Sequence, residues 1–353
     1  MLNGTTSIPT LSWDEGADRQ GVYLRVGLRG LFIYIGVYIP IILFIVVGNS
    51  LLLLSFLRFK KVRTVSNYYI FALAGVDLLT GLIAIPLTIC SRLIVSDFTC
   101  QASTRSYILL PVYFCGEVSV CILMGITIDR YIAITYPFRY PTMMTPKTTK
   151  RFILFLFIFA TVHSSLPLWN FGSDRYQWVC TTGPYESPAS NIHIISVSLL
   201  IPFLLLCMTA AYGRIFYIAF VKKSAVSRLS KFKSAHWQKR LRTTLTCAIV
   251  IVAFTVCWIP NSCKIIFEIF FAKDAQSLLA IQTFGEWFVF MSSCTNPVIY
   301  GLRNETFKQA YKKTFLDFCY RSETQPKRKE TAYTITTGVD KQVKKNEFQQ
   351  SRL

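Results

Sequence analysis

The sequence predicts an all-α membrane protein: a seven-transmembrane helix bundle with a short amphipathic helix after the last span. Three observations lead to this fold. The chain of 353 residues is 52% hydrophobic and only 16% charged, which is more apolar than an ordinary soluble domain. Its apolar residues gather into stretches long enough to cross about 30 Å of hydrocarbon. Its basic residues lie mainly between or after these stretches, as in cytoplasmic segments of membrane proteins.

Seven apolar stretches account for the expected spans, and the segments between them set the orientation. Basic segments alternate with near-neutral ones, which predicts a multi-pass protein of the plasma membrane with its N-terminus outside and its C-terminus in the cytoplasm. We divide the chain into an extracellular N-terminal tail (1–30), the bundle (31–302), a cytoplasmic amphipathic helix (303–319) and a disordered cytoplasmic tail (320–353). The expected spans are 31–57, 68–89, 106–133, 152–169, 192–220, 241–270 and 278–302.

The two ends of the bundle have distinct sequence signals. The first stretch, 31–57, is too long for a cleaved signal peptide and is expected to serve as the first span. After the last span, apolar Phe307 and Phe315 alternate with Lys308 and Lys312, as in an amphipathic helix on a membrane surface. From Arg321 onward the composition is polar and charged, which predicts disorder.

The charge and the reactive residues exclude several function classes. The net charge of +20 does not indicate a nucleic-acid partner, because the basic residues alternate with the spans. The eleven cysteines contain no CxxC pair, so a zinc site is not expected. The three histidines, His163, His193 and His236, are scattered along the chain, and neither HExxH nor GxSxG occurs. We therefore do not expect an enzyme.

Polar motifs inside the apolar stretches carry the functional prediction. Ionisable groups are costly at such positions, so they are functional candidates. Asp129-Arg130-Tyr131 ends the third stretch, Cys257-Trp258-Ile259-Pro260 lies in the sixth, and Asn296-Pro297-Val298-Ile299-Tyr300 lies in the seventh. In this order and context the motifs resemble the rhodopsin-like (class A) G protein-coupled receptors, over roughly 31–319. The subfamily resemblance is faint, toward amine, adenosine and melatonin receptors.

The resemblance implies a receptor that transduces an extracellular small-molecule or short-peptide ligand to heterotrimeric G proteins. In the family, Arg130 would be held by Asp129 at rest and contact the G protein when active. The sixth span begins with Arg240 and no nearby acid, so an ionic lock to Arg130 cannot form there, and we expect appreciable basal signalling. The expected coupling and switch residues are Asp129, Arg130, Tyr131, Tyr212, Phe254, Trp258, Pro260, Pro297 and Tyr300.

A sodium site is the expected role of the carboxylate in the second span. The resemblance assigns it to Asp77, Ser119, Asn49 and Asn296, and oxygen ligands suit a hard cation. The alternative is a protonated Asp77 that hydrogen-bonds Asn296. No other cofactor or metal is expected. The rival function, a secondary transporter using Asp77 as an ion or proton site, predicts internal repeats, which the sequence does not show.

The resemblance implies a disulfide, and short sequence patterns predict further covalent features and partners. Cys100 and Cys180 match the family's extracellular disulfide. Asn3 lies in an N-glycosylation motif, and Cys319 is a candidate for palmitoylation. Serines and threonines after 320 predict phosphorylation by a receptor kinase and binding of arrestin. The C-terminal Ser351-Arg352-Leu353 is a candidate PDZ ligand.

The ligand is expected to be an amine, a nucleoside-like molecule or a short peptide. Val112 stands where amine receptors carry an Asp, and Phe290 stands where opsins carry their Lys, so the chain is not expected to bind retinal. Glu286 should point into the outer half of the bundle, whereas Glu117 is turned toward the fourth and fifth spans. Either acid is expected to pair with a cationic ligand, to pair with Arg92 or Lys264, or to stay protonated. The expected ligand-binding residues are Val112, Tyr113, Gly116, Glu117, Asn261, Ser262, Ile265, Glu286 and Phe290.

Overall fold

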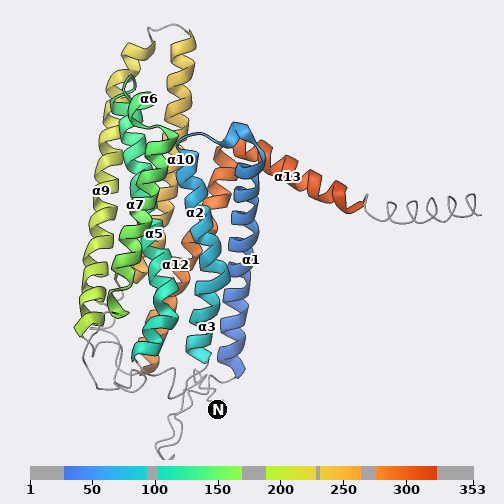
Figure 1. Ribbon diagram of the computed structural model, residues 1–353, viewed down its shortest axis with the longest axis vertical. Helices are drawn as coiled ribbons and strands as arrows, with labels where there is room; N and C mark the ends of the chain where they lie inside the picture. The colour runs from blue at the N-terminus through green and yellow to red at the C-terminus, as the bar shows by residue number, and fades with distance from the viewer. Residues whose placement is uncertain (1–27, 94–101, 169–187, 228–230, 264–274, 324–353) are drawn as a thin grey trace, which may run out of the picture.

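The computed structural model describes residues 28–93, 102–168, 188–227, 231–263 and 275–323, and every regular element within these ranges is a helix. The long helices lie side by side in one bundle, and α13 projects sideways from it (Figure 1). The elements are α1 (Leu28–Arg58), η1 (Lys60–Val62), α2 (Asn67–Leu79), η2 (Thr80–Ala84), α3 (Ile85–Leu93), α5 (Ala102–Thr135), α6 (Tyr140–Met143), α7 (Pro146–Ser164), η3 (Leu166–Leu168), α9 (Pro188–Ser227), α10 (Lys231–Ser262), α12 (Ala275–Arg303) and α13 (Glu305–Glu323).

The predicted seven-helix bundle is confirmed. Six helical segments are long and apolar enough to cross a membrane by length and composition. The seventh helix of the bundle, α12, has 29 residues and packs against α1 and α10. The six candidate spans are Ile35–Arg58, Asn67–Ser91, Tyr107–Thr135, Pro146–Leu168, Ile195–Val221 and Arg240–Ser262.

The start of the fourth span differs from the sequence prediction because a local cap sets it. The fourth span begins at Pro146 rather than at 152, because Thr145 caps α7 by accepting a hydrogen bond from the backbone N–H of Thr148 at 3.2 Å. Proline at the first helical position fits such a start, since its missing N–H has no partner there anyway. Helices α9 and α10 extend past the other helices at the end where α13 begins (Figure 1). We call this the α13 end of the bundle.

The second span is interrupted by a wide turn. It consists of α2, the π-helical segment η2 and α3, with Pro86 as the second residue of α3. A proline removes a backbone donor and cannot continue a regular hydrogen-bond ladder, and a π-bulge is one way in which a helix absorbs such a defect. The interruption lies about one turn beyond Asp77, so it helps set the direction in which the buried carboxyl group points.

Helix α5 lies at the centre of the packing and the outer surface is apolar. It contacts α2, α3, α7, α9 and α10, and its inner positions such as Val118, Ile122 and Leu123 are completely buried. By contrast, Phe44 and Phe155 on other helices are 67% and 59% exposed. Large apolar side chains on the outside of a bundle are expected where lipid, not water, surrounds the protein.

A glycine allows α5 to approach α2 and α7 closely. A Cβ atom at Gly125 would lie 2.8 Å from Cε1 of Tyr69 and 3.2 Å from Cδ1 of Leu156. The Tyr69 ring is completely buried, so it has little room to move aside. A Cβ atom at Gly75, also inside a transmembrane helix, would meet nothing within 4 Å. Both glycines therefore lie inside transmembrane helices, but only Gly125 is closely packed against its neighbours.

Replacing Gly125 with Ala is expected to destabilise the bundle by about 1–3 kcal/mol through overpacking. Gly75→Ala is the control and should be neutral or mildly stabilising, because alanine is the better helix former by roughly 1 kcal/mol. Thermal melting of the purified full-length variants in detergent measures both effects. Equal melting temperatures for the two variants would contradict the assigned packing.

Candidate functional site

A buried charge cluster occupies the α13 end of α5. Arg130 donates from Nε to Oδ2 of Asp129 at 3.0 Å and makes a second contact with it through Nη2, and the two residues are only 5% and 0% exposed. Ser66, just before α2, donates to the same carboxylate oxygen at 2.8 Å, and Tyr140 of α6 donates to Oδ1 at 3.0 Å. Three segments therefore hold the carboxylate in place.

Ser66 and Tyr140 are not among the residues that the sequence predicts for this cluster. Burial, together with the charge of Asp129, raises the pKa of Tyr140, so its hydroxyl remains a proton donor at neutral pH. On the α10 side, Arg240 donates to the backbone carbonyl of Ala133 at 3.5 Å, and α10 contains no acidic residue. In this structure the contacts of Arg130 therefore come from Ser66 at the start of α2, from α5 and from α6, and not from an acid on α10.

The predicted aromatic switch residues lie together in the core. The rings of Phe254 and Trp258 stack with their centroids 5.3 Å apart. Trp258 lies against α5, where a Cβ atom at Gly116 would be 3.3 Å from its ring. Tyr212 and Tyr300 are both buried, and their hydroxyls have no hydrogen-bond partner within the described part of the chain. These two hydroxyls are therefore available for a rearranged state.

The remaining predicted switch residues have structural places on the same helices. Tyr131 is partly buried and packs against the main core cluster. Pro260 and Pro297 lie inside α10 and α12 respectively. Membrane helices tolerate such prolines as kinks or hinges because neighbouring groups satisfy the freed carbonyls.

The predicted sodium-site residues are all buried, but they differ in their contacts. Asn296 donates to Oδ2 of Asp77 at 2.8 Å, which matches the hydrogen bond of the alternative interpretation. Ser119 donates to the carbonyl of Cys115, and Asn49 donates to the carbonyls of Ile45 and Ser293. The side-chain oxygen of Asn49 is buried and accepts no hydrogen bond from the described residues.

The donor atoms of these residues suit a small hard cation. The carboxylate of Asp77, the hydroxyl of Ser119 and the amide oxygen of Asn49 are oxygen donors, the type that hard cations prefer. Sodium binding at this cluster stays a prediction.

The predicted ligand residues gather at the end opposite α13. Val112 and Tyr113 come from α5, Asn261 and Ser262 end α10, and Glu286 and Phe290 come from α12. The backbone of α12 at Gly285 approaches Asn261, since a Cβ atom at Gly285 would lie 3.4 Å from the Asn261 Cα. Ile265 lies outside the described residues.

An aromatic cluster joins α1 and α12 beside these residues. The Tyr38 ring meets Trp287 and Phe290 edge-on, with centroid distances of 6.3 and 6.0 Å. Val112 of α5 packs against the same cluster. Val112 and the segment of α12 that carries Glu286 therefore belong to one packed unit.

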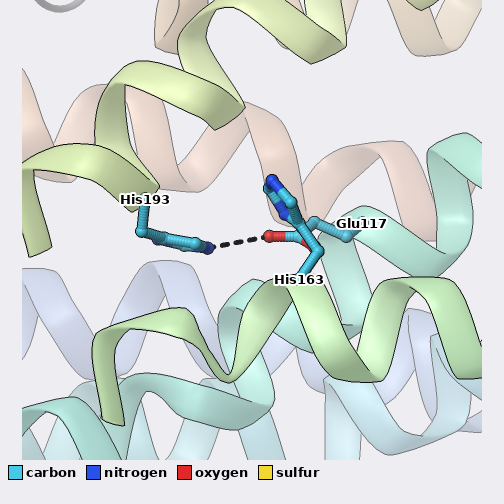
Figure 2. Close-up of side chains that lie close together, drawn as sticks. All are labelled: Glu117, His163 and His193. Carbon is cyan, nitrogen blue, oxygen red and sulfur yellow. Dashed lines mark hydrogen bonds and ion pairs between the residues drawn. The ribbon is translucent and has the colours of Figure 1, made fainter. Parts of the chain in front are cut away.

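Glu117 has partners that the sequence analysis did not consider. His163, in the last turn of α7, lies 2.8 Å from Oε2 of Glu117 through its Nδ1, and His193 of α9 lies 2.9 Å from Oε1 through its Nε2. Figure 2 shows both rings pointing at the carboxylate. The histidines treated as scattered thus include two that meet inside the bundle. The signal was present, because Glu117 was expected to face the fourth and fifth spans, and both histidines lie at the same end of those spans.

Several predicted covalent features and contacts concern residues outside the described ranges. Asn3, Cys100, Cys180 and Lys264 are such residues. Cys319 lies in α13. The disulfide, the glycosylation site and the palmitoylation site stay predictions.

Comparison with known proteins agrees with this arrangement. Residues 48–300 match the family model described as 7 transmembrane receptor (rhodopsin family). The chain is 28% identical to the histamine H2 receptor of Rattus norvegicus over 284 residues, covering 78% of this chain and 77% of the relative. It is 27% identical to the histamine H2 receptor of Cavia porcellus over 289 residues, covering 79% and 78%. It is 25% identical to G protein-coupled receptor 161 of Bos taurus over 342 residues, covering 87% of this chain and 61% of the relative.

If Asp77 binds sodium, the purified protein should melt at a higher temperature in sodium chloride than in choline chloride of equal ionic strength, because a ligand that binds only the folded state stabilises it. The Asp77→Asn variant should lose this difference, since the amide removes the negative charge that attracts the cation. Wild-type melting that is independent of sodium would support the direct Asn296 hydrogen bond as the complete arrangement.

Proposed function

The chain belongs to the rhodopsin family of seven-transmembrane receptors, and we propose that its ligand is a small organic cation that pairs with Glu286 of α12. As a G protein-coupled receptor, it transduces an extracellular ligand signal to a heterotrimeric G protein. This family membership gives no support to the secondary-transporter alternative. The proposed class of ligand and its anchoring group depend on the residues around Glu286.

The observation that carries the proposal is the packing of Val112 with the aromatic cluster of α1 and α12. The usual amine anchor on α5 is absent, because Val112 occupies that position. Glu286 provides a carboxylate on α12, next to Trp287 and four residues from Phe290, so the negative charge is supplied from another side of the same region. A carboxylate in such a half-buried, aromatic setting favours a cationic partner.

The second acid expected to contact a ligand, Glu117, is held by two other side chains. Both of its carboxylate oxygens bond a histidine, one on α7 and one on α9. A ligand that paired with Glu117 would have to displace these contacts. The similarity to histamine H2 receptors, which are amine receptors, supports a ligand with a basic nitrogen.

The proposed orientation places the α13 end in the cytoplasm and the Glu286 end outside. The basic segments that follow the positive-inside pattern support it, as does the family role of Arg130 at the α13 end. In this arrangement ligand binding favours a state in which the inner end of α10 moves away from α5 and a G protein contacts Arg130. Receptor kinase, arrestin and a PDZ protein are proposed to act on the tail after 320.

A screen of small organic amines, nucleosides and short peptides in cells that report cAMP and calcium should yield an amine agonist. Glu286→Gln should lower its potency by at least roughly 30-fold, which corresponds to losing about 2 kcal/mol of a buried charge pair. Arg130→Ala should abolish the response at equal surface expression, because it removes the G protein contact.

Glu286→Asp is the matched control for this experiment, because it keeps the charge and should retain most of the potency. A neutral agonist, or an amine agonist whose potency is the same with Glu286→Gln, would contradict the proposed anchor. It would leave the receptor function intact.

Basal signalling should exceed that of cells lacking the receptor, and Asp129→Asn should raise it several-fold. The substitution weakens the buried ion pair that restrains Arg130, and breaking a buried pair has a large effect. Asp317→Asn is the control, because its pair with Arg58 is about half exposed on both sides and exposed pairs contribute little. Unchanged basal signalling with Asp129→Asn, at matched surface expression, would show that this pair does not restrain the receptor.

A further inference from the structure

A cluster of one carboxylate and two imidazoles crosses three helices of the bundle. Glu117 comes from α5, His163 from α7 and His193 from α9 (Figure 2). Their potential ligand atoms all lie within 4.8 Å of one another. Glu117 and His193 are 5% and 2% exposed. We propose that these three residues form a binding site for a divalent transition metal ion, with Zn²⁺ as the best-fitting ion.

The donor set is the first argument. Two imidazole nitrogens and one carboxylate oxygen are a ligand combination that zinc commonly takes, with bonds of about 2.0–2.2 Å. Sodium and magnesium prefer oxygen ligands alone, so a site with two nitrogens favours a transition metal. Three protein ligands leave one tetrahedral position for water or an anion, which is typical of an open zinc site.

The spacing is the second argument. Tetrahedral ligands at these bond lengths lie about 3.4 Å from one another. The two contacts of Glu117 with nitrogen are now 2.8 and 2.9 Å, which are hydrogen-bond distances. A metal ion would take the place of the two bridging protons, and the three ligand atoms, which now lie within 4.8 Å of one another, would close around it to about 3.4 Å. Such a shift is within the reach of side-chain rotation.

The surroundings hold the rings in a suitable orientation. The Tyr113 ring packs on His193 with a centroid distance of 4.9 Å, and the Phe159 ring stacks on His163 at 6.0 Å. The two imidazole rings are 5.5 Å apart. Rings that are fixed by their neighbours lose less freedom when a metal binds, which favours affinity. The His163 side chain is 15% exposed.

Because the cluster lies between three helices, a bound metal would connect them. It would tie the central helix α5 to α7 and α9, one residue from Gly116, which contacts Trp258. Bound metal would therefore stabilise the arrangement of three helices beside the proposed ligand site. Metal binding itself does not depend on the ligand proposal, and its test involves neither an agonist nor a G protein.

The test is a titration of the purified full-length protein with zinc chloride against a competing chelating dye. Wild type should bind one zinc ion per molecule through this site and show a higher melting temperature with zinc chloride than with magnesium chloride. His163→Gln and His193→Gln should each weaken that binding by at least about tenfold. His236→Gln is the matched control, because it removes the third histidine without changing the cluster, and it should bind zinc as wild type does.

Equal zinc affinity in wild type and in both cluster variants would overturn the proposal, as would the absence of binding up to about 100 μM zinc, where free surface histidines begin to compete. If the cluster variants do not fold, the absorption spectrum of Co²⁺ bound to wild type identifies the ligands. A tetrahedral cobalt spectrum without sulfur-to-metal charge-transfer bands supports the nitrogen and oxygen ligands. A spectrum with those bands would assign the metal to cysteines and overturn the site.

Discussion

The structure depends on one physical constraint: an ionised or polar group inside an apolar bundle must have a partner within the bundle. Surrounding hydrocarbon cannot satisfy it, and the cost of an unpaired charge is several kcal/mol. Three buried acids meet this constraint differently. Asp129 bonds an arginine, Asp77 bonds an amide and Glu117 bonds two imidazoles. The bonds of Asp77 and Glu117 connect helices that otherwise touch mainly through apolar side chains.

Helix α5 is the element that turns separate polar pairs into one connected structure. It carries Glu117 toward α7 and α9, and it carries Asp129 with Arg130 toward Ser66 at the start of α2 and toward α6. Its glycines also allow close contacts, with Tyr69 at Gly125 and with Trp258 at Gly116. A rearrangement of any of these contacts along α5 must be accommodated by the same helix. This central position explains why so many predicted site residues lie on one element.

Hydropathy and motif order predicted the local features of the chain, whereas contacts that depend on three-dimensional proximity were missed. The seven spans and the family are recoverable because apolar length and the order of the motifs can be seen along the sequence. Ser66 and Tyr140 were missed because they reach Asp129 from positions 63 and 11 residues away. The histidine pair was missed for the same reason. The sequence did predict that Glu117 faces the fourth and fifth spans, which carry the two histidines. The early start of α7 was missed because a single threonine cap, and not hydropathy, sets it.

Two contacts of α10 with α5 bear on the proposed movement of α10 away from α5. Trp258 meets α5 at Gly116, and Arg240 meets it at the carbonyl of Ala133. The two α10 residues are 18 positions apart, or about 27 Å along a helix. The contact at Arg240 is a single long hydrogen bond between a cation and a carbonyl. The packed contact at Trp258 buries a large ring in a tight space and is the stronger of the two. A ligand that acts near Trp258 therefore works on the more tightly packed of these two contacts between α10 and α5.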